Sequence, residues 1–306
     1  MNQKSKKINF SPLAIIIIVF LIVYMLAMIV MLGWTIITTI KMPEEYHGWG
    51  LDKNILWLPK EKWAFDNYLT AYKYFRVEAD ILNSSGEFVD TKDYGILYQF
   101  LNSLLYSVGC ATTVTLASLV MGYATARFKY KFSEIIYAFV LITMALPIVG
   151  SMPSEIAVAT DLRIFNTFHG IWIMRGNFLN TYFLIFYAQF KMIPKDYTEA
   201  AKIDGANPFT IMTQIIVPLA AGTISAVFVL AFIGYWNDFQ IPMVYLPSHP
   251  VAAYGMYVFQ NEADGETSYV PVKLAGIFLM AVPIIVFYAV FNKKMNVNLS
   301  VGGIKG

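Results

Sequence analysis

One long uncharged stretch restricts the fold of this chain more than any other feature of its sequence. Residues 13–40 contain no Asp, Glu, Lys or Arg and are almost entirely apolar. A helix needs about 20 apolar residues to cross the hydrocarbon core of a bilayer. Ser11 and Pro12 precede the stretch as a helix cap and a first-turn proline. We therefore predict a first transmembrane helix over residues 13–40. The stretch is too long for a cleaved signal peptide, and no small-residue cleavage site follows it.

The composition fits a chain with several such helices. Hydrophobic residues make up 58% of the 306 residues and charged residues 14%, against about 45–50% and 25% in soluble domains. Further apolar stretches occupy residues 96–126, 133–147, 170–190, 218–236 and 274–291. We expect an all-α polytopic membrane protein with six transmembrane helices, the last five of which form a core over residues 96–293.

Lysine and arginine residues predict how the helices are oriented, because these residues gather on the cytoplasmic side of a membrane. Six crossings bring the short basic clusters to one face; they lie at residues 4–7, 127–131, 191–202 and 293–294. This predicts a multi-pass protein of the cell (inner) membrane, surrounded by membrane lipid. Residues 1–12 form a cytoplasmic N-terminus and residues 294–306 a cytoplasmic C-terminal tail.

The same arrangement makes residues 41–95 an extracytoplasmic loop. This loop is polar and contains Trp49, Trp57 and Trp63. Tryptophans beside a membrane are typical interfacial anchors. The alternative is that they form a docking surface for an external partner.

The sequence lacks the residues that several classes of function require. The predicted helices have almost no ionisable residues at mid-membrane depth, where a proton- or sodium-driven carrier would need them. His47, His169 and His249 have no metal-ligand spacing, Cys110 is the single cysteine, and no phosphate-binding glycine loop occurs. A net charge of +2 gives no basic surface for nucleic acid. We expect no metal or cofactor on this chain and no enzymatic activity, so the energy for transport must come from another chain.

Residues 191–217, between the predicted fourth and fifth helices, carry the most specific pattern. Residues 194–204 favour a short helix, with Gly205 as its left-handed stop. Asn207 and Pro208 then supply the cap and first turn of a second helix, which leads to Pro218. The sequence therefore predicts a helix–turn–helix at the cytoplasmic face.

This segment resembles the EAA loop of binding-protein-dependent ABC importers. The matching residues are Glu199, Ala200, Ala201, Gly205, Ile215, Val217 and Pro218. Val217 stands where the family usually has leucine. Residues 234–239, GYWNDF, and 298–306, NLSVGGIKG, are similar to the carbohydrate-uptake permeases of the maltose-transporter MalG type. The resemblance covers nearly the whole chain.

The resemblance implies a type I ABC importer permease fold in which the first helix of the loop is a coupling helix. That helix would dock on a cytoplasmic ATPase, where Glu199 would pair with a basic residue and Gly205 would make the turn. The implied coupling residues are Glu199, Ala200, Ala201, Asp204, Gly205 and Pro218. The C-terminal tail would also contact the ATPase, through Gly302, Gly303 and Lys305. ATP and Mg would bind to the two ATPase subunits. The other implied partners are a second, non-identical permease and an extracytoplasmic solute-binding protein.

Polar residues near the predicted helices are candidates for a solute path. They are Asn102, Ser103, Tyr235, Trp236, Asn237 and Asp238. Asn102 and Ser103 could instead bind helices together, and Tyr235 and Trp236 could be interfacial. A run of small residues that includes Gly109 and Gly122 favours close helix packing over a pore lining.

We expect a permease subunit of an ATP-driven importer for a carbohydrate, specifically an oligosaccharide. The alternatives are a permease of the same superfamily for another solute, such as a lipid-linked or peptide substrate, a membrane enzyme, or a scaffold.

Overall fold

The computed structural model describes residues 11–47, 54–60, 62–82, 87–128, 131–146, 150–262 and 265–299. The chain forms two compact units. The first unit comprises Met1–Tyr74 and Glu262–Leu279, and the second comprises Phe75–Asn261 and Met280–Gly306.

The first unit is built around the C-terminal end of one long helix. It contains α1 (Pro12–Thr39), α2 (Pro43–His47), α3 (Asp66–Tyr74), the 3₁₀ helix η3 (Gly265–Ser268) and the beginning of α15 (Val270–Leu299). The side chain of Ser11 caps α1 by accepting a hydrogen bond from the backbone N–H of Ala14, and Pro12 opens the helix, as predicted. At the other end, Asn67 donates to the carbonyl oxygens of Thr39 and Lys41.

Lys41 is fully buried, which is unusual for a lysine. Its Nζ donates to the carbonyl oxygens of Asn54 and Ile55, and the Trp34 indole donates to Ile55 as well. These bonds attach residues 54–55 to the last turns of α1. Trp57 and Trp63 remain exposed. Their membrane or docking role stays a prediction, and Trp49 lies outside the described residues.

The second unit begins with a β-hairpin, so the expectation of an all-α chain is wrong here. Strands β1 (Arg76–Leu82) and β2 (Phe88–Gly95) pair antiparallel, with Arg76 opposite Gly95 and an irregularity at Ile81/Leu82. The sequence does contain a signal for the hairpin. Val77 and Ala79 alternate with exposed polar residues on β1, and residues 83–86 read NSSG, which favours a turn.

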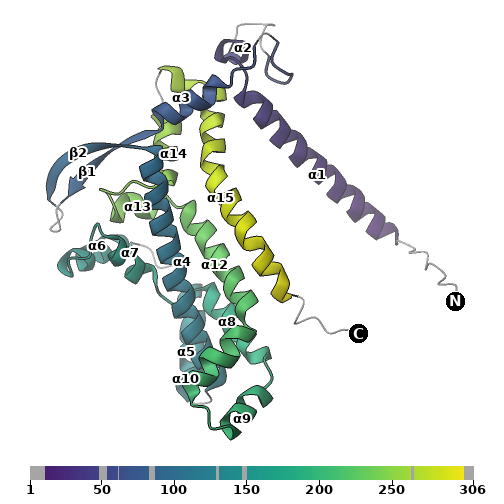
Figure 1. The fold of residues 1–306 in the computed structure, drawn as a ribbon, viewed down its shortest axis with the longest axis vertical. Coiled ribbons are helices and arrows are strands. Elements are labelled where there is room, and N and C mark those ends of the chain that lie inside the picture. The colour runs from purple at the N-terminus through teal and green to yellow at the C-terminus, as the bar shows by residue number, and fades with distance from the viewer. Residues whose placement is uncertain are drawn as a thin grey trace. The chain divides into compact units, whose positions relative to one another are not determined.

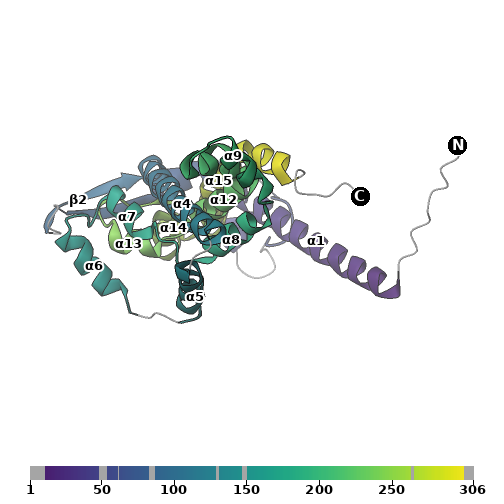
Figure 2. The same cartoon turned by 90° about the horizontal axis from the view of Figure 1, so that it is seen from below.

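Helix α4 (Ile96–Arg127) is the centre of the second unit. Figures 1 and 2 show it beside α8 (Thr181–Met192) and α12 (Ala221–Trp236). The small residues on α4 allow this close packing. A Cβ atom added to Gly109 would overlap the Trp172 indole, and one added to Gly122 would lie 2.8 Å from the Cβ of Phe186. The packing interpretation of these glycines is confirmed.

The remaining helices differ from the predicted spans in one main respect. Residues 170–190 do not form one helix, because α7 (Phe168–Arg175) ends at Gly176 and α8 starts afresh at Asn180. The Asn180 side chain accepts hydrogen bonds from the N–H groups of Tyr182 and Phe183, which makes it the new cap. The other helices are α5 (Lys131–Ala145), α6 (Met152–Asp161), α13 (Gln240–Tyr245) and α14 (Ala252–Asn261).

Two helices among the described residues, α1 and α4, are long and apolar enough to cross a membrane. A third crossing is available if the bent pair Pro208–Leu219 and Ala221–Trp236 counts as one span. The chain is therefore mostly helical with membrane-spanning segments, and the number of six crossings stays a prediction.

Candidate functional site

The predicted helix–turn–helix is present where the sequence indicates it. Helix α9 (Asp196–Ile203) ends at Asp204, and Gly205 follows with φ +80°. The N–H of Gly205 donates to the carbonyl of Lys202, and the N–H of Ala206 donates to that of Ala201. This pair of bonds is the Schellman pattern, in which glycine accepts a backbone conformation that is costly for other residues.

The second helix of the loop is less regular than predicted. The side-chain oxygen of Asn207 caps α10 (Pro208–Thr210) by accepting a hydrogen bond from the N–H of Thr210. A π-helix, η2 (Ile211–Ile216), and the short α11 (Val217–Leu219) follow. The chain then bends by 75° before α12, so the fifth predicted span begins at Ala221 and not at Pro218. Pro218 has no N–H to donate, which favours an irregular helix at this point; π-helical turns are rare and often occur at functional sites.

Only part of α9 is buried. Ala201 packs into a core that includes Tyr123 of α4 and Phe190 of α8, whereas Ala200 and Tyr197 are exposed. Of these three residues, only Ala201 is covered within this chain. Glu199 is also exposed, and in the described part of the chain no hydrogen bond or ion pair engages its carboxylate.

Large apolar side chains of this loop, and of the end of α8 before it, are also uncovered. Ile203 is 87% exposed and Met192 79%. Phe209 and Tyr197 are exposed as well. Ile203 follows Glu199 by four residues, so the two lie on the same side of α9, and exposed apolar side chains often mark interaction surfaces. The loop therefore presents the unpaired Glu199 carboxylate, the exposed Ala200 and an exposed apolar side chain, Ile203, on α9, which suits a protein groove with a basic residue in it.

The candidate path residues of α4 serve packing in this structure. Asn102 donates to the carbonyl of Pro250, and the Ser103 hydroxyl accepts from the N–H of Ala252. Both side chains are buried. These bonds hold the start of α14 against α4, as the packing alternative requires.

The other four candidates lie together at the end of α12. The Tyr235 ring packs edge-on against Tyr106 of α4, with ring centroids 5.6 Å apart. Trp236 is buried in the core, and Asn237 is exposed with its amide bonded to the Ile233 carbonyl. Asp238 accepts from the Tyr106 hydroxyl at 2.9 Å and from the N–H of Ile241. Tyr235 and Asp238 thus share Tyr106 as a neighbour, which sequence reasoning did not identify.

A second polar cluster was missed because its members are far apart in the sequence. Glu155 of α6 accepts from the Arg175 guanidinium at 3.2 Å, from the Tyr245 hydroxyl at 2.7 Å and from the Ser151 hydroxyl. The Arg175 guanidinium also lies 4.9 Å from the centre of the Tyr245 ring. The single charge of Arg175 at the end of an apolar stretch was the available signal, since such a charge usually has an acidic partner.

The environment of this cluster changes two pKa values. Burial alone would raise the pKa of Glu155, but the hydrogen bonds from Tyr245 and Ser151 and the charge of Arg175 lower it below its ordinary value. Burial and the bond to Glu155 raise the pKa of Tyr245 to about 12. The cluster is therefore a carboxylate held in its charged form by two donors and a cation.

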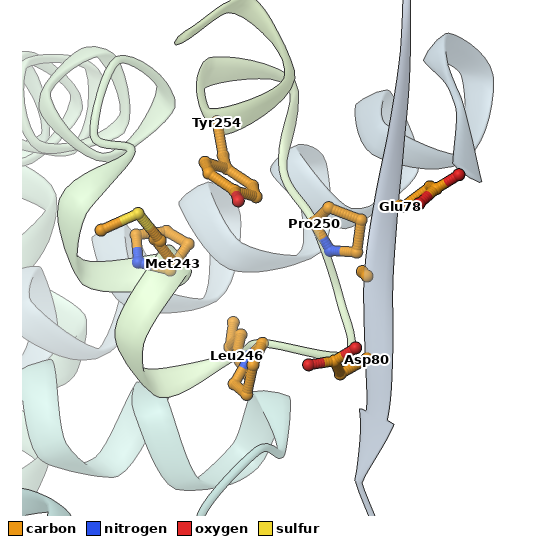
Figure 3. A pocket seen from close by; sticks show the side chains of 9 residues that line it. Glu78, Asp80, Met243, Leu246, Pro250 and Tyr254 are labelled. Atoms are coloured by element: carbon orange, nitrogen blue, oxygen red, sulfur yellow. The ribbon is translucent and has the colours of Figure 1, made fainter. Parts of the chain in front are cut away.

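A small groove lies beside β1 (Figure 3), with a volume of about 160 Å³. The lining residues are Glu78, Ala79, Asp80, Pro242, Met243, Leu246, Pro247, Pro250 and Tyr254. Asp80 and Tyr254 point toward it in Figure 3. Ser248 fixes its wall: the hydroxyl accepts from the N–H of Leu82 and donates to the carbonyl of Asp80. Three prolines and these bonds make the groove rigid, but it is smaller than the usual small-molecule site of about 300–1,000 Å³.

Some predicted features fall outside what the structure describes. The tail residues Gly302, Gly303 and Lys305 are among them. Within the described residues, no group of three or more His, Cys, Asp or Glu side chains could hold a metal ion.

A family of known proteins matches more than half of this chain. Residues 115–296 match the family described as binding-protein-dependent transport system inner membrane component. The chain belongs to this family. The match includes α8, α9, the bent segment and most of α15. The family members found by comparison are permease subunits and not enzymes, and the chain is an inner-membrane component of an ABC transporter.

Individual relatives extend the likeness to the rest of the chain. The diacetylchitobiose uptake permease NgcG of Streptomyces coelicolor is 25% identical over 285 residues, which cover 92% of this chain and 86% of that protein. The trehalose/maltose permease MalG of Thermococcus litoralis is 28% identical over 208 residues, which cover 66% of this chain and 73% of that protein. A bacterial ABC transporter that imports alginate has the same fold, with a TM-score of 0.70 at 19% identity over 94% of this chain and 99% of that one. The predicted resemblance to MalG-type permeases is confirmed.

Proposed function

We propose that this chain is one permease subunit of an ATP-driven, binding-protein-dependent importer, and that the solute is a carbohydrate, specifically an oligosaccharide. The observation that carries the coupling part is the α9 loop, which exposes Glu199 and Ala200 among uncovered apolar side chains. A surface of this chemistry requires a protein partner. In an importer without a nucleotide site of its own, that partner is the ATPase.

The position of α9 in the second unit supports this role. The hairpin ends at Gly95, directly before α4 begins, and the other end of α4 lies beside the residues that precede α9. A helix of 32 residues is about 48 Å long, which is more than the thickness of the hydrocarbon core. The hairpin and the α9 loop therefore belong to opposite sides of the membrane. With the basic clusters inside, α9 and both chain termini are cytoplasmic and the hairpin is extracytoplasmic.

The complete transporter then contains more chains than this one. We infer a second, non-identical permease, two ATPase subunits that bind ATP and Mg, and an extracytoplasmic solute-binding protein. Gly302, Gly303 and Lys305 of the tail are proposed to contact the ATPase. The sugar assignment rests on relatives whose names state diacetylchitobiose and trehalose/maltose uptake. An importer for a non-sugar solute is the remaining candidate.

Glu199→Ala tests the coupling role. The chain is purified with its native partners, reconstituted in vesicles and supplied with ATP and radiolabelled maltose, trehalose or diacetylchitobiose. Loss of a charge-assisted pair costs about 1.5–3 kcal/mol, so the variant should lose ATPase from the purified complex or hydrolyse ATP without uptake. The matched control is Asp196→Ala, which removes another exposed acid from the same helix and should leave uptake unchanged. Normal assembly and normal uptake in Glu199→Ala would refute the coupling role. Failure of the wild-type complex to take up any of the three sugars would refute the oligosaccharide assignment for those solutes.

A further inference from the structure

Arg127, the last residue of α4, reaches the main chain that leads into α9. Its Nη1 donates to the carbonyl oxygen of Ile193 at 3.0 Å, and Nη2 lies 3.5 Å from that of Pro194. Helix α8 ends at Met192 and α9 starts at Asp196. The guanidinium therefore binds the short connection between the two helices.

The carbonyl oxygens of this connection are suited to a cation that can donate two hydrogen bonds at once. The last carbonyls of a helix have no partners within the helix, and they carry partial negative charge that favours a cation. Pro194 has no N–H with which to donate a hydrogen bond of its own. Arginine can donate to two carbonyl oxygens at once from a planar, rigid group, whereas lysine cannot reproduce that geometry.

The same region is packed as well as hydrogen-bonded. Ile193 is buried in the core that contains Tyr123 of α4, Phe190 of α8 and Ala201 of α9. Arg127 therefore lies at the edge of an apolar cluster that joins the end of α4 to the start of α9. A force applied to α9 reaches this cluster first, because the remainder of that helix is largely exposed.

We propose that Arg127 is a positioning residue that makes α9 and the end of α4 move as one body, so that displacement of α9 by the ATPase is transmitted into the membrane. The inference rests on the proposed coupling function of α9. Without the guanidinium, residues 193–195 act as a hinge: α9 moves with the ATPase while α4 stays in place. ATP hydrolysis then continues while uptake falls. A residue that only stabilised the fold would instead lower hydrolysis and uptake together.

The first test measures uptake per ATP hydrolysed in the reconstituted complex. Arg127→Met keeps an apolar side chain of similar length and removes the hydrogen-bond donors. Arg127→Lys keeps the positive charge but lacks the planar pair of donor groups. Lys131→Met is the matched control, because it removes an exposed cation from the start of α5. We expect the ratio to fall about tenfold in Arg127→Met, equivalent to about 1.4 kcal/mol of coupling, with hydrolysis within about twofold of wild type. The ratio for Arg127→Lys should lie between those of Arg127→Met and wild type, and the ratio for Lys131→Met should equal that of wild type. A wild-type ratio in both Arg127 variants would overturn the proposal.

The second test does not depend on the identity of the sugar. Nitroxide labels at Lys202→Cys on α9 and Leu116→Cys on α4, both exposed positions, report the distance between the two helices in the intact complex. The distance should stay constant on addition of ATP, Mg and vanadate when Arg127 is present, and should shift or broaden in Arg127→Met or Arg127→Lys. Equal distributions in wild type and both variants would overturn the proposal. Failure of the coupling function itself would appear separately, as uncoupled wild-type protein or as normal uptake by Glu199→Ala.

Discussion

Substitution of Gly109 should open the contact between α4 and α7. The Trp172 indole lies directly against Gly109, and its Nε1 donates to the Leu105 carbonyl at 3.1 Å. The Cβ of an alanine at position 109 would overlap the indole and lie 2.5 Å from its Cδ1 atom. Real Cβ atoms do not approach other carbons this closely, so Gly109→Ala must displace Trp172 and break its hydrogen bond.

The size of the effect follows from three contributions. Overpacking in a close-packed core costs about 1–3 kcal/mol, and loss of the indole hydrogen bond costs about 1 kcal/mol. Alanine is better than glycine in a helix by about 1 kcal/mol, which offsets part of the loss. Gly109→Ala should therefore reduce the stability of the α4–α7 contact by about 1–3 kcal/mol, or about 5- to 150-fold in the opening equilibrium.

Cys110 supplies the assay, because it is the single cysteine of the chain and is fully buried beside Gly109. A maleimide dye labels it only when this region opens, and the labelled chain is resolved from its partners by mass. Labelling of Gly109→Ala should be about 5- to 150-fold faster than wild type under native conditions, and equal to wild type after denaturation.

The control for helix propensity is Gly234→Ala in α12, where an added Cβ meets no atom within 4 Å. Trp172→Ala in the Gly109→Ala background should recover part of the loss, because the overlap is gone. The reasoning is refuted if Gly109→Ala labels within about twofold of Gly234→Ala.

Two further predictions concern the turn after α9 and the Glu155 cluster. Gly205→Ala forces a Cβ into a backbone with φ +80°, which costs about 1–2 kcal/mol; proteolysis of the α9 loop should accelerate, whereas Gly234→Ala should leave it unchanged. Because the folded-state pKa of Glu155 is lowered, its contribution to stability is fully present above the ordinary glutamate value of about 4.3. It is lost as the pH falls through the lower folded value. The melting temperature of Glu155→Gln should therefore be lower than that of wild type at neutral pH and should converge with it in acid. A constant difference down to about pH 3 would contradict this.

Local features of the structure could be predicted because a few neighbouring residues decide them. The uncharged residues 13–40 and the Ser11 cap fix α1, which spans Pro12–Thr39. Gly205 and Asn207 fix the end of α9 and the start of the next helix through bonds within about five residues. The glycines of α4 likewise indicated close packing, since nothing larger fits where two helices approach.

Other predictions failed where several local signals competed. The apolar run 170–190 suggested one helix, but Gly176 and the capping side chain of Asn180 divide it into two. The polar composition of residues 41–95 predicts a loop, whereas β1 alternates buried and exposed residues and pairs with β2. In both cases a few residues decide the local structure, whereas the average polarity of the whole segment predicts a different one.

The sequence by itself determined the membrane class, the first and second long helices, the α9 turn and, through the EAA pattern, the family. Only the tertiary structure decided which polar groups meet. Tyr106 and Asp238 are separated by 132 residues, Glu155 and Tyr245 by 90, and Arg127 and Ile193 by 66. Helix caps and apolar stretches depend on residues that are neighbours in the sequence, so the sequence alone reveals them. A buried hydrogen bond between distant residues depends instead on how the whole chain packs, because each partner satisfies the other only after the helices between them have been placed.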